Sequence, residues 1–590
     1  MLDVERRQQH RYHFPLLIRL MKKIFSLILM TAALALAANY NAFANKAKPT
    51  PVQIQKEDGS HITVQLHGDE FCHWTTLNGA MFGEKVYSEI KRGMTFGGNS
   101  PARSNGASGD RISIGNKKFL VVLAEFDNLE FDLDDPYAYF NDHFNQEGFS
   151  RDGATGSVRD YYIENSKGLF TPQYDVWGPV KVSKGYNYYA GSSGTAHVAE
   201  MVAEVIGLLK EQYEDLNLAD YDNDGNGYVD NIFMIYAGYS AAEGASGHIW
   251  PHKYDVRAYK NVSYDGVKLA DYACGSELRG TYGSKPSGIG TACHEFGHSI
   301  GIPDYYDTDY SGAIGLGEYS VMDSGSYNND GCTPPFIDGV SRKLMGWMED
   351  SDFEIWIESG EKTIDFIQDN HAYIINTPNE GEFFMIECRK DESWDAPLKH
   401  RGYDCPIGMV IYHVDQSQNR VGGITAENHW INWDSYNDIN DTPSHELFKF
   451  VYSKKYSNGI YGNISSFPGY YNITSWTKSS AIGPTAWNGK WIGVTITDIR
   501  VNSDKTVTMY FDRDFKYRCI KLEKSSYSVG DNIPLALQGS NIEGASVVWK
   551  WDGQEVSGSV TASATGTHTL VAIINDASGE ENITATVKVD

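Results

Sequence analysis

Three closely spaced residues have side chains that could do chemistry: His294, Glu295 and His298. Histidines four residues apart lie on one face of a helix, one turn from each other, and their imidazoles can bind one zinc ion. Glu295 directly follows the first histidine, so its carboxylate can reach a metal-bound water without binding the metal. The spacing therefore predicts a zinc site on a helix, with Glu295 as the general base.

The residues after this helix predict a turn that brings the chain back towards the metal. Gly301 tolerates positive φ and is typical of helix ends, and Pro303 discourages the helix from continuing. After the turn, Asp304 can offer a carboxylate oxygen as the third protein ligand. Three protein ligands leave one position for water, which is the catalytic arrangement of zinc rather than the structural one. Glu318 is the alternative third ligand.

A second signal is Met322, in the segment 320–325, which reads Ser-Val-Met-Asp-Ser-Gly. A methionine in a tight turn after the zinc helix is typical of the metzincin clan of zinc peptidases. The glycines around it favour a turn on composition alone. A lone methionine is more often an ordinary core residue, so the interpretation of Met322 as a structural Met-turn depends on its place after the zinc helix.

Residues 294–307, which end in Pro-Asp-Tyr-Tyr-Asp, resemble the immune inhibitor A family of secreted bacterial metallopeptidases. The segments 158–166 and 67–71 resemble the same family, and the resemblance covers roughly residues 50 to 512. It implies a metzincin-like catalytic domain that binds zinc and calcium and is secreted as a zymogen. The chain departs from the better-known metzincins at Asp304, where they carry a third histidine.

An acidic loop upstream of the zinc motif has oxygen-bearing residues at alternate positions. Its candidate calcium ligands are Asp222, Asp224, Asn226, Tyr228 and Asp230. This spacing matches the front of a calcium loop, which needs a glycine at its sixth position. The glutamate that closes an EF-hand loop is replaced by a phenylalanine, so the loop is not a complete EF-hand. The alternative is an Asp/Asn turn between a helix and a strand.

The composition describes a large acidic chain, with 590 residues and a formal net charge of −27. This length predicts three or four domains, and the charge argues against nucleic acid as a partner. The 38 tyrosines and 58 glycines favour a β-rich, loop-rich extracellular protein. Seven cysteines without a CxxC pair argue against a cysteine zinc site. Bridges could join Cys388 to Cys405, or two of Cys274, Cys293 and Cys332.

The N-terminal region predicts export. Residues 21–44 have a basic start, an apolar stretch and an Ala-Phe-Ala end, which together predict a signal peptide cleaved after Ala44. The apolar stretch is too short for a transmembrane anchor. Since no other stretch of the sequence is as long and apolar as a membrane span, we expect no transmembrane segment in the mature chain.

Residues 45–111 predict a pro-segment and a linker. Two alternating runs around an Asp-Gly turn indicate a β-hairpin, and residues 97–112 are rich in Gly, Ser and Asn, as in a flexible linker with processing sites. A secreted protease needs restraint, and its open zinc position is the simplest point to block. Cys72 and Asp69 are candidates for this latency contact. The alternative is that Cys72 is a small core residue.

Residues 112–350 are predicted to form the catalytic domain. Its expected elements are a buried strand and three helices, at 118–126, 158–166, 195–213 and 336–347. Short β-runs predict a β-rich domain over 351–515, in which His413 and Asp415 have structural roles. Regular alternation over 516–590 predicts an immunoglobulin-like sandwich.

The expected fold is an α+β metzincin-like zinc peptidase domain, followed by a β-rich domain and a C-terminal immunoglobulin-like β-sandwich. The expected function is a secreted zinc endopeptidase, made as a zymogen, which hydrolyses protein or peptide substrates as a monomer and uses zinc and calcium. Its compartment is extracellular, periplasmic or the cell surface. The alternative is a non-catalytic, zinc-stabilised surface-binding protein or adhesin, against which the intact Glu295 argues.

Overall fold

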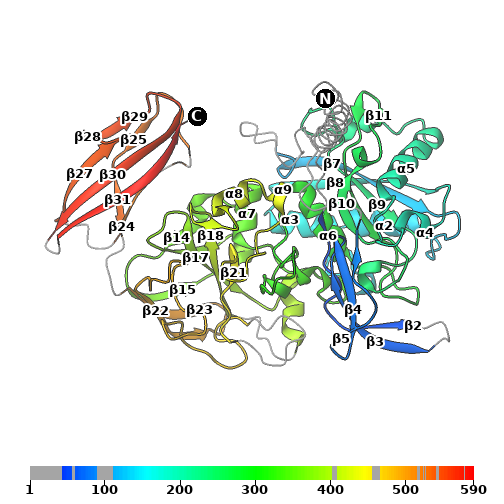
Figure 1. Cartoon of the computed structure of the whole chain (residues 1–590), viewed down its shortest axis with the longest axis horizontal. Coiled ribbons are helices and arrows are strands. Elements are labelled where there is room, and N and C mark those ends of the chain that lie inside the picture. The colour runs from blue at the N-terminus through cyan, green and yellow to red at the C-terminus, as the bar shows by residue number, and fades with distance from the viewer. Residues whose placement is uncertain are drawn as a thin grey trace, which may run out of the picture.

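The computed structural model of the chain is drawn in Figure 1. The residues it describes are 43–55, 60–88, 111–401, 408–454, 465–513, 518–522, 524, 526–539, 544–576 and 579–589. Residues 21–42 of the predicted signal peptide (21–44) and residues 97–110 of the predicted linker (97–112) lie outside this description.

A six-stranded sheet forms the centre of the largest domain, in the order β1-β10-β13-β9-β7-β8. Its strands are β1 (Phe43–Ala44), β7 (Gly115–Glu125), β8 (Phe170–Lys181), β9 (Ile232–Tyr236), β10 (His252–Asp255) and β13 (Asp271–Ser276). The strands β8, β7, β9 and β13 are parallel, whereas β10 and β1 are antiparallel to their neighbours. The expected buried strand at 118–126 is therefore confirmed as the middle part of β7.

Helices cover both faces of this sheet (Figure 1). They are α2 (Pro136–Asn145), α3 (Val158–Asn165), α5 (Val198–Gln212) and α6 (Ile289–Ile300). Alternate residues of β7 explain the two layers, since Leu120 and Val122 pack with α5 and Phe119 and Val121 pack with the other three helices. The predicted helices at 158–166 and 195–213 are confirmed. A reciprocal hydrogen-bond pair between Ser157 and Asp160 begins α3.

The predicted helix at 336–347 is shorter than expected. It is α7 (Gly339–Met345), and the side chain of Asp338 caps its first turn by accepting a hydrogen bond from the N–H of Ser341 at 2.9 Å. The cap fixes the start of the helix, and Pro334 and Pro335 just before it disfavour helical conformation. Gly346, at φ 76°, ends it.

The region after α7 is β-rich, as predicted. Its two main sheets contain β14 (Phe353–Ile355), β16 (Ala372–Asn376), β17 (Glu382–Arg389), β18 (Gly408–Asp415) and β21 (Phe448–Phe450), and β15 (Gly360–Ile364), β22 (Val494–Val501) and β23 (Val507–Arg513). Phe384 and Met409 face the smaller sheet, whereas Met385, Val410 and Tyr412 face α7 and the catalytic core. The β-rich domain therefore shares a continuous core with the domain that carries α6.

The C-terminal lobe, red in Figure 1, contains only strands among its described residues. They are β24 (Arg518–Ile520), β25 (Asn532–Pro534), β26 (Leu537–Gly539), β27 (Ser546–Trp551), β28 (Gln554–Val556), β29 (Ser559–Thr561), β30 (Gly566–Asp576) and β31 (Gly579–Val589). Four of them form one sheet, in the order β28-β27-β30-β31.

The region predicted to be a pro-segment, blue in Figure 1, forms a small sheet beside α6 and β10. Its strands are β2 (Val52–Gln55), β3 (His61–Gly68), β4 (Cys72–Leu77), β5 (Ala80–Met81) and β6 (Val86–Tyr87). The predicted pairing of its first two strands is confirmed. His73 stacks on Trp250 with ring centroids 4.5 Å apart, and Trp74 meets Tyr310 edge-on at 5.3 Å. These contacts fix the segment against the catalytic domain.

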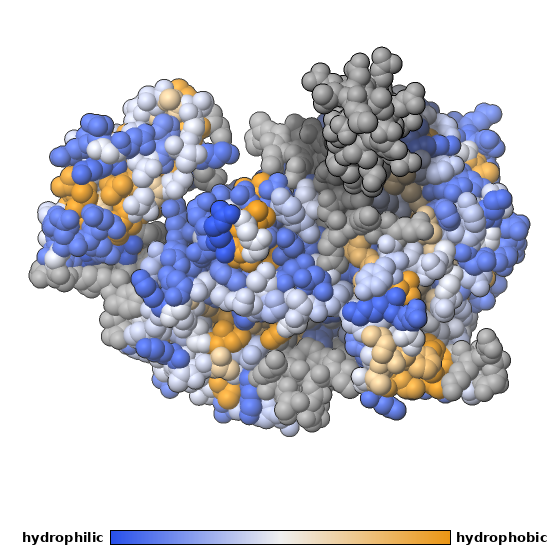
Figure 2. All heavy atoms as spheres, in the orientation of Figure 1, coloured by the Kyte–Doolittle hydropathy of each residue, from blue (hydrophilic) through white to orange (hydrophobic). Residues whose placement is uncertain are grey.

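The remaining short elements lie in loops. They are α4 (Tyr186–Ala190), α8 (Ala426–Ile431), α9 (Trp433–Tyr436), β11 (Ser263–Tyr264), β12 (Val267–Lys268), β19 (Arg420–Val421) and β20 (Ile424–Thr425). In the described part of the chain, no helix combines the length and apolar character needed to cross a bilayer. Among the coloured residues of Figure 2, hydrophilic ones dominate the visible face and the hydrophobic areas are separate from one another.

The structure contains no disulfide among Cys274, Cys293 and Cys332, so none of the three pairings they allow is formed. The thiols of Cys274 and Cys293 are fully buried in the two cores that flank the central sheet. Cys405, the expected partner of Cys388, lies outside the described residues.

Candidate active site

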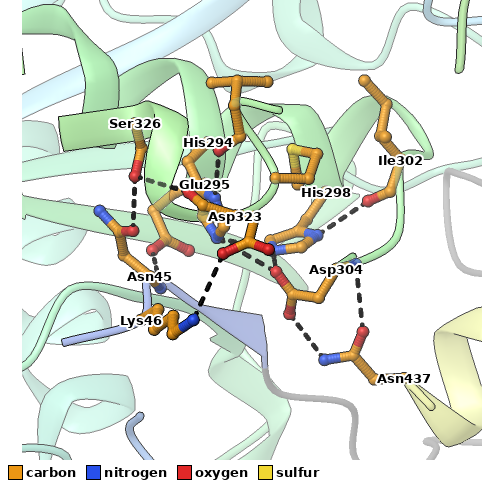
Figure 3. A network of polar contacts seen from close by, with 12 residues as sticks. Asn45, Lys46, His294, Glu295, His298, Ile302, Asp304, Asp323, Ser326 and Asn437 are labelled. Atoms are coloured by element: carbon orange, nitrogen blue, oxygen red, sulfur yellow. Dashed lines mark hydrogen bonds and ion pairs between the residues drawn. The ribbon is translucent and has the colours of Figure 1, made fainter. Parts of the chain in front are cut away.

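The two histidines of the zinc motif are oriented by backbone carbonyl groups (Figure 3). His294 Nδ1 lies 2.8 Å from the carbonyl oxygen of Val321, and His298 Nδ1 lies 2.8 Å from that of Ile302. A carbonyl oxygen can only accept, so each Nδ1 carries the proton and each Nε2 keeps its lone pair. The two Nε2 atoms are 3.2 Å apart and face the same point. This is the form in which imidazoles bind a metal.

Asp304 completes this group of donor atoms. Gly301 ends α6 at φ 115°, which lets the chain reverse directly after the second histidine. Asp304 Oδ1 then lies 3.3 Å from His294 Nε2 and 3.4 Å from His298 Nε2. Tetrahedral zinc with bonds of about 2.05 Å requires ligand atoms about 3.3 Å apart. Two nitrogens and one carboxylate oxygen at this spacing fit a zinc ion.

The electrostatics of Asp304 also suit a metal ligand. Its carboxyl group is fully buried, and Oδ1 has no hydrogen-bond partner. Burial acts to raise its pKa, but positive charge at His298 and His294, together with the hydrogen bond from Asn437, lowers the pKa below the ordinary value. A cation bound to the two neutral imidazoles would supply this positive charge and keep the group a carboxylate.

Asn437 holds the second oxygen of Asp304. Its Nδ2 donates to Asp304 Oδ2 at 2.7 Å, and its Oδ1 accepts from the N–H of Asp304 at 3.3 Å (Figure 3). Asn437 follows α9 in the β-rich domain and has φ 45°, a left-handed conformation that asparagine tolerates. Sequence reasoning missed this residue, because nothing in its local sequence marks it and it lies 133 positions from Asp304.

Glu295 lies beside the metal-binding group with a fully buried carboxyl group. Its Oε1 accepts a hydrogen bond from the backbone N–H of Asn45 at 2.7 Å, and its Oε2 has no hydrogen-bond partner. Burial, and after it the nearby charge of Asp304, raises the pKa of Glu295 well above its ordinary value. A carboxyl group with a high proton affinity beside a metal site can take a proton from water and release it again.

Met322 lies in a tight turn underneath the zinc helix. A Cβ at Gly297 would be 2.9 Å from the sulfur of Met322, so the glycine of the motif makes room for the thioether. The preceding residue supplies the carbonyl oxygen that orients His294. The following residue, Asp323, accepts from the N–H groups of Leu316 and Gly317 at 3.0 and 2.8 Å. The turn therefore orients His294 through the carbonyl oxygen of Val321.

Glu318, the alternative third ligand, and the two strand residues His413 and Asp415 lie on other elements. Glu318 is buried on the short helix Gly317–Tyr319. His413 lies on β18, where its Nε2 is 2.8 Å from Glu382 Oε1, and Asp415 on the same strand is 2.7 Å from His445 Nε2. These pairs join strand and loop within the β-rich domain, which agrees with the structural roles expected for His413 and Asp415.

Three carboxylates of the acidic loop converge as a calcium site requires. Asp222, Asp224 and Asp230 each place an oxygen within 4.8 Å of the others. Asp230 is fully buried: Oδ2 accepts two hydrogen bonds from Asn223, but Oδ1 has no hydrogen-bond partner. Burial, assisted by the charges of Asp224 and Asp222, raises the pKa of Asp230 to about 7. A divalent cation would satisfy this oxygen and offset the repulsion.

The other two residues of the loop have different roles in this geometry. Asn226 Oδ1 accepts from the N–H of Tyr228 at 2.9 Å, and its own N–H donates to Asp222 and Asp224. The loop is thus already closed by its own hydrogen bonds, as an Asp/Asn turn would be. A simple Asp/Asn turn does not explain why the buried Oδ1 of Asp230 has no hydrogen-bond partner.

The latency candidates lie on the pro-segment hairpin. Asp69 is buried, and its Oδ1 accepts from the N–H groups of Phe71 and Cys72 at 2.9 and 3.1 Å. Burial, and after it the charges of Asp304 and Asp69, raises the pKa of Tyr306, two residues after Asp304. Cys72 is half-buried on β4. The pro-segment residue that contacts Glu295 directly is Asn45, which sequence reasoning did not single out.

Comparison with known proteins finds one family and a small set of relatives. Residues 113–347 match the profile described as the immune inhibitor A peptidase M6, catalytic domain. The chain is 29% identical over 261 residues to the pre-pro-metalloprotease PrtV of Vibrio cholerae, and 27% identical over 276 residues to immune inhibitor A of Bacillus thuringiensis subsp. alesti. These matches cover 37% and 39% of this chain. They span only 28% and 38% of the respective relatives' lengths.

Proposed function

Given that the chain belongs to the immune inhibitor A family of peptidases, we propose that it is a secreted zinc-dependent endopeptidase that hydrolyses protein substrates. One observation carries the proposal: two imidazole nitrogens and a carboxylate oxygen converge at 3.2 to 3.4 Å beside the buried Glu295. His294, His298 and Asp304 would hold the zinc ion, and Asn437 would orient Asp304.

The chemistry divides between the metal and Glu295. A bound zinc ion supplies a Lewis acid for the scissile carbonyl and lowers the pKa of a bound water. Glu295 takes the proton from the attacking water and later gives it to the leaving amine nitrogen. Its unpartnered Oε2 supports the first step, and the amide nitrogen 2.7 Å from its Oε1 supports the second.

The finer architecture belongs to the same proposal. We assign a metzincin-like fold to residues 112–350, with Met322 in the Met-turn, and an immunoglobulin-like fold to residues 516–590. The antiparallel strand β10 beside four parallel strands, and the all-strand C-terminal lobe, support these assignments. We also propose cleavage of the signal peptide after Ala44 and release as a monomer.

A protease assay separates this function from that of a non-catalytic adhesin. The processed protein is expected to digest casein or gelatin, and a chelator should stop digestion, which added zinc should restore. A protein that binds surfaces through its β-rich half but leaves both substrates intact, with zinc present, would be an adhesin.

Calcium is expected to stabilise the fold through the loop that contains Asp230. Binding to the folded state alone at one hundred times its dissociation constant contributes about 2.7 kcal/mol, or roughly 5–10 °C in melting temperature. Melting curves with and without calcium after complete chelation measure this shift. Asp230→Asn should abolish it, whereas Asp134→Asn, at an exposed position, should keep it. An unchanged melting curve of the original chain would make the loop a simple turn.

The pro-segment is expected to keep the precursor latent. It donates a hydrogen bond to Glu295 through Asn45, and Lys46 Nζ lies 3.4 Å from Asp323 beside the Met-turn. We expect the uncut precursor to digest casein at least about tenfold more slowly than protein that starts near Ile112, because the general base is already engaged.

Asp69→Ala and Cys72→Ala precursors test the two candidate blocking residues. A rise in precursor activity in either variant identifies that residue as part of the block. If the uncut precursor is as active as the shortened protein, the segment only assists folding.

A further inference from the structure

Residues 45–48 lie against the candidate active site in an extended conformation. Just before them, β1 pairs antiparallel with the edge strand β10. The indole N–H of Trp250 donates to the carbonyl oxygen of Asn45 at 2.9 Å, and the hydroxyl of Tyr327 donates to that of Lys46 at 2.7 Å. The N–H of Lys48 donates to the carbonyl oxygen of Ala242 at 2.9 Å. These contacts hold the backbone of residues 45–48 in continuation of β1, and they do not depend on the side chains of that segment.

The position of Asn45 relative to Glu295 indicates which residue of a bound substrate would lie at this place. The amide nitrogen of Asn45 lies 2.7 Å from Glu295 Oε1. In hydrolysis, the nitrogen that receives a proton from the general base is that of the leaving amine. Asn45 therefore occupies the place of the substrate residue that follows the cleaved bond. Once the signal peptide is removed after Ala44, as proposed above, this nitrogen is the terminal amine of the chain, which is the group that the leaving amine of a substrate becomes.

The side chain of Asn45 fills a closed polar pocket. Its Nδ2 donates to Thr291 Oγ1 at 3.1 Å. Its Oδ1 accepts from Ser326 Oγ at 2.9 Å, the contact drawn in Figure 3. Asn45 is completely buried there. Thr291 lies on α6 one turn before Glu295, and Ser326 lies in the turn Ser324–Tyr327 that follows Met322.

Backbone packing fixes the two sides of this pocket, the start of α6 and the turn Ser324–Tyr327, relative to each other. A Cβ at Gly290 would lie 1.9 Å from the carbonyl oxygen of Ser326, and one at Gly288 would lie 2.2 Å from that of Gly331. The start of α6 is thus in direct backbone contact with the turn. The distance between Thr291 and Ser326 is fixed by this packing, and a side chain must match it.

We propose that the Thr291–Ser326 pocket is a specificity site that selects asparagine after the cleaved bond, an inference that rests on the proposed peptidase function. The carboxamide pairs with both hydroxyl groups. An aspartate of the same shape brings a second buried negative charge next to Glu295. A leucine loses both of these hydrogen bonds, and Ser326 Oγ keeps only its contact with the carbonyl oxygen of Asp323 at 3.2 Å. The enzyme accordingly cleaves on the amino side of asparagine in extended segments of its protein substrates.

Amide hydrogen exchange of the full chain tests recognition without any use of hydrolysis. Exchange of residues 45–48 is expected to be about tenfold or more faster in Asn45→Asp and Asn45→Leu than in the original chain. The Thr291→Val/Ser326→Ala double variant should show the same increase. Gln53→Leu, at an exposed site of the same pro-segment, is the matched control and should exchange like the original. Unchanged exchange in all Asn45 variants overturns the proposal.

Peptide cleavage by the processed enzyme tests selection of substrates. Three peptides differ only in the residue after the cleaved bond, which is asparagine, aspartate or leucine. We expect kcat/KM for asparagine to exceed the other two by about tenfold or more, and the double variant to bring this ratio close to one. Casein digestion with equal cleavage of all three peptides overturns the specificity site and leaves the peptidase function intact. Absence of any hydrolysis overturns the peptidase function, and with it the substrate preference.

Discussion

Replacement of Glu295 by glutamine is expected to abolish peptide hydrolysis while the metal stays bound. Glutamine has the same shape, and its Oε1 can still accept the hydrogen bond that Asn45 donates to Glu295. It cannot take a proton from water at neutral pH. Loss of a general base typically lowers the rate by about 10²- to 10⁴-fold. The ligand group of His294, His298 and Asp304 is unchanged, so the zinc content should stay near one ion per chain.

The measurement combines casein digestion with metal analysis of the same purified protein. Glu211→Gln is a matched control, because Glu211 is an exposed glutamate on α5 and should tolerate the change without loss of activity. Full activity of the Glu295→Gln enzyme would disprove the assigned mechanism. Loss of activity together with loss of zinc would show that Glu295 supports the metal rather than the proton transfer.

Replacement of Asp304 by alanine is expected to remove most of the bound zinc. The carboxylate oxygen lies 3.3 and 3.4 Å from the two imidazole nitrogens, so its loss leaves only two protein ligands. Activity should fall with the metal. Asn437→Ala removes the partner of the other oxygen and should weaken zinc affinity by about 10- to 100-fold, the usual effect of such supporting residues.

Metal analysis after dialysis against zinc-free buffer provides the test. Glu318→Ala serves as the comparison, since Glu318 is the alternative third ligand. Zinc retained by the Asp304→Ala protein and lost from the Glu318→Ala protein would reverse the assignment. The apo proteins must show the same melting behaviour for the comparison to concern the metal alone.

The parts of the site that could be predicted are those encoded within a few residues. His294 and His298 are one helical turn apart, and Gly301 reverses the chain after them, so short-range geometry is enough to bring them near Asp304. The long helix α5 was equally predictable, since its buried residues recur at helical spacing over fifteen residues.

The parts that could not be predicted depend on contacts between distant segments. Asn437 reaches Asp304 from 133 positions away, and Asn45 reaches Glu295 from 250 positions away. No local pattern distinguishes these two asparagines from the others in the chain. The apolar run that predicts a helix from residue 336 continues past Pro335, but the cap at Asp338 makes α7 begin at Gly339.

The domain that contains α6 and the β-rich domain share one continuous hydrophobic core, so neither is expected to fold stably without the other. The family profile ends at residue 347, but Met385, Tyr412 and Phe448 complete the packing around α7, and Asn437 completes the setting of Asp304. A recombination or nonsense mutation just after residue 347 would expose this apolar face and remove that support. The smallest self-supporting unit around the candidate active site therefore extends through the second sheet, to about residue 513, whereas the C-terminal lobe has its own core.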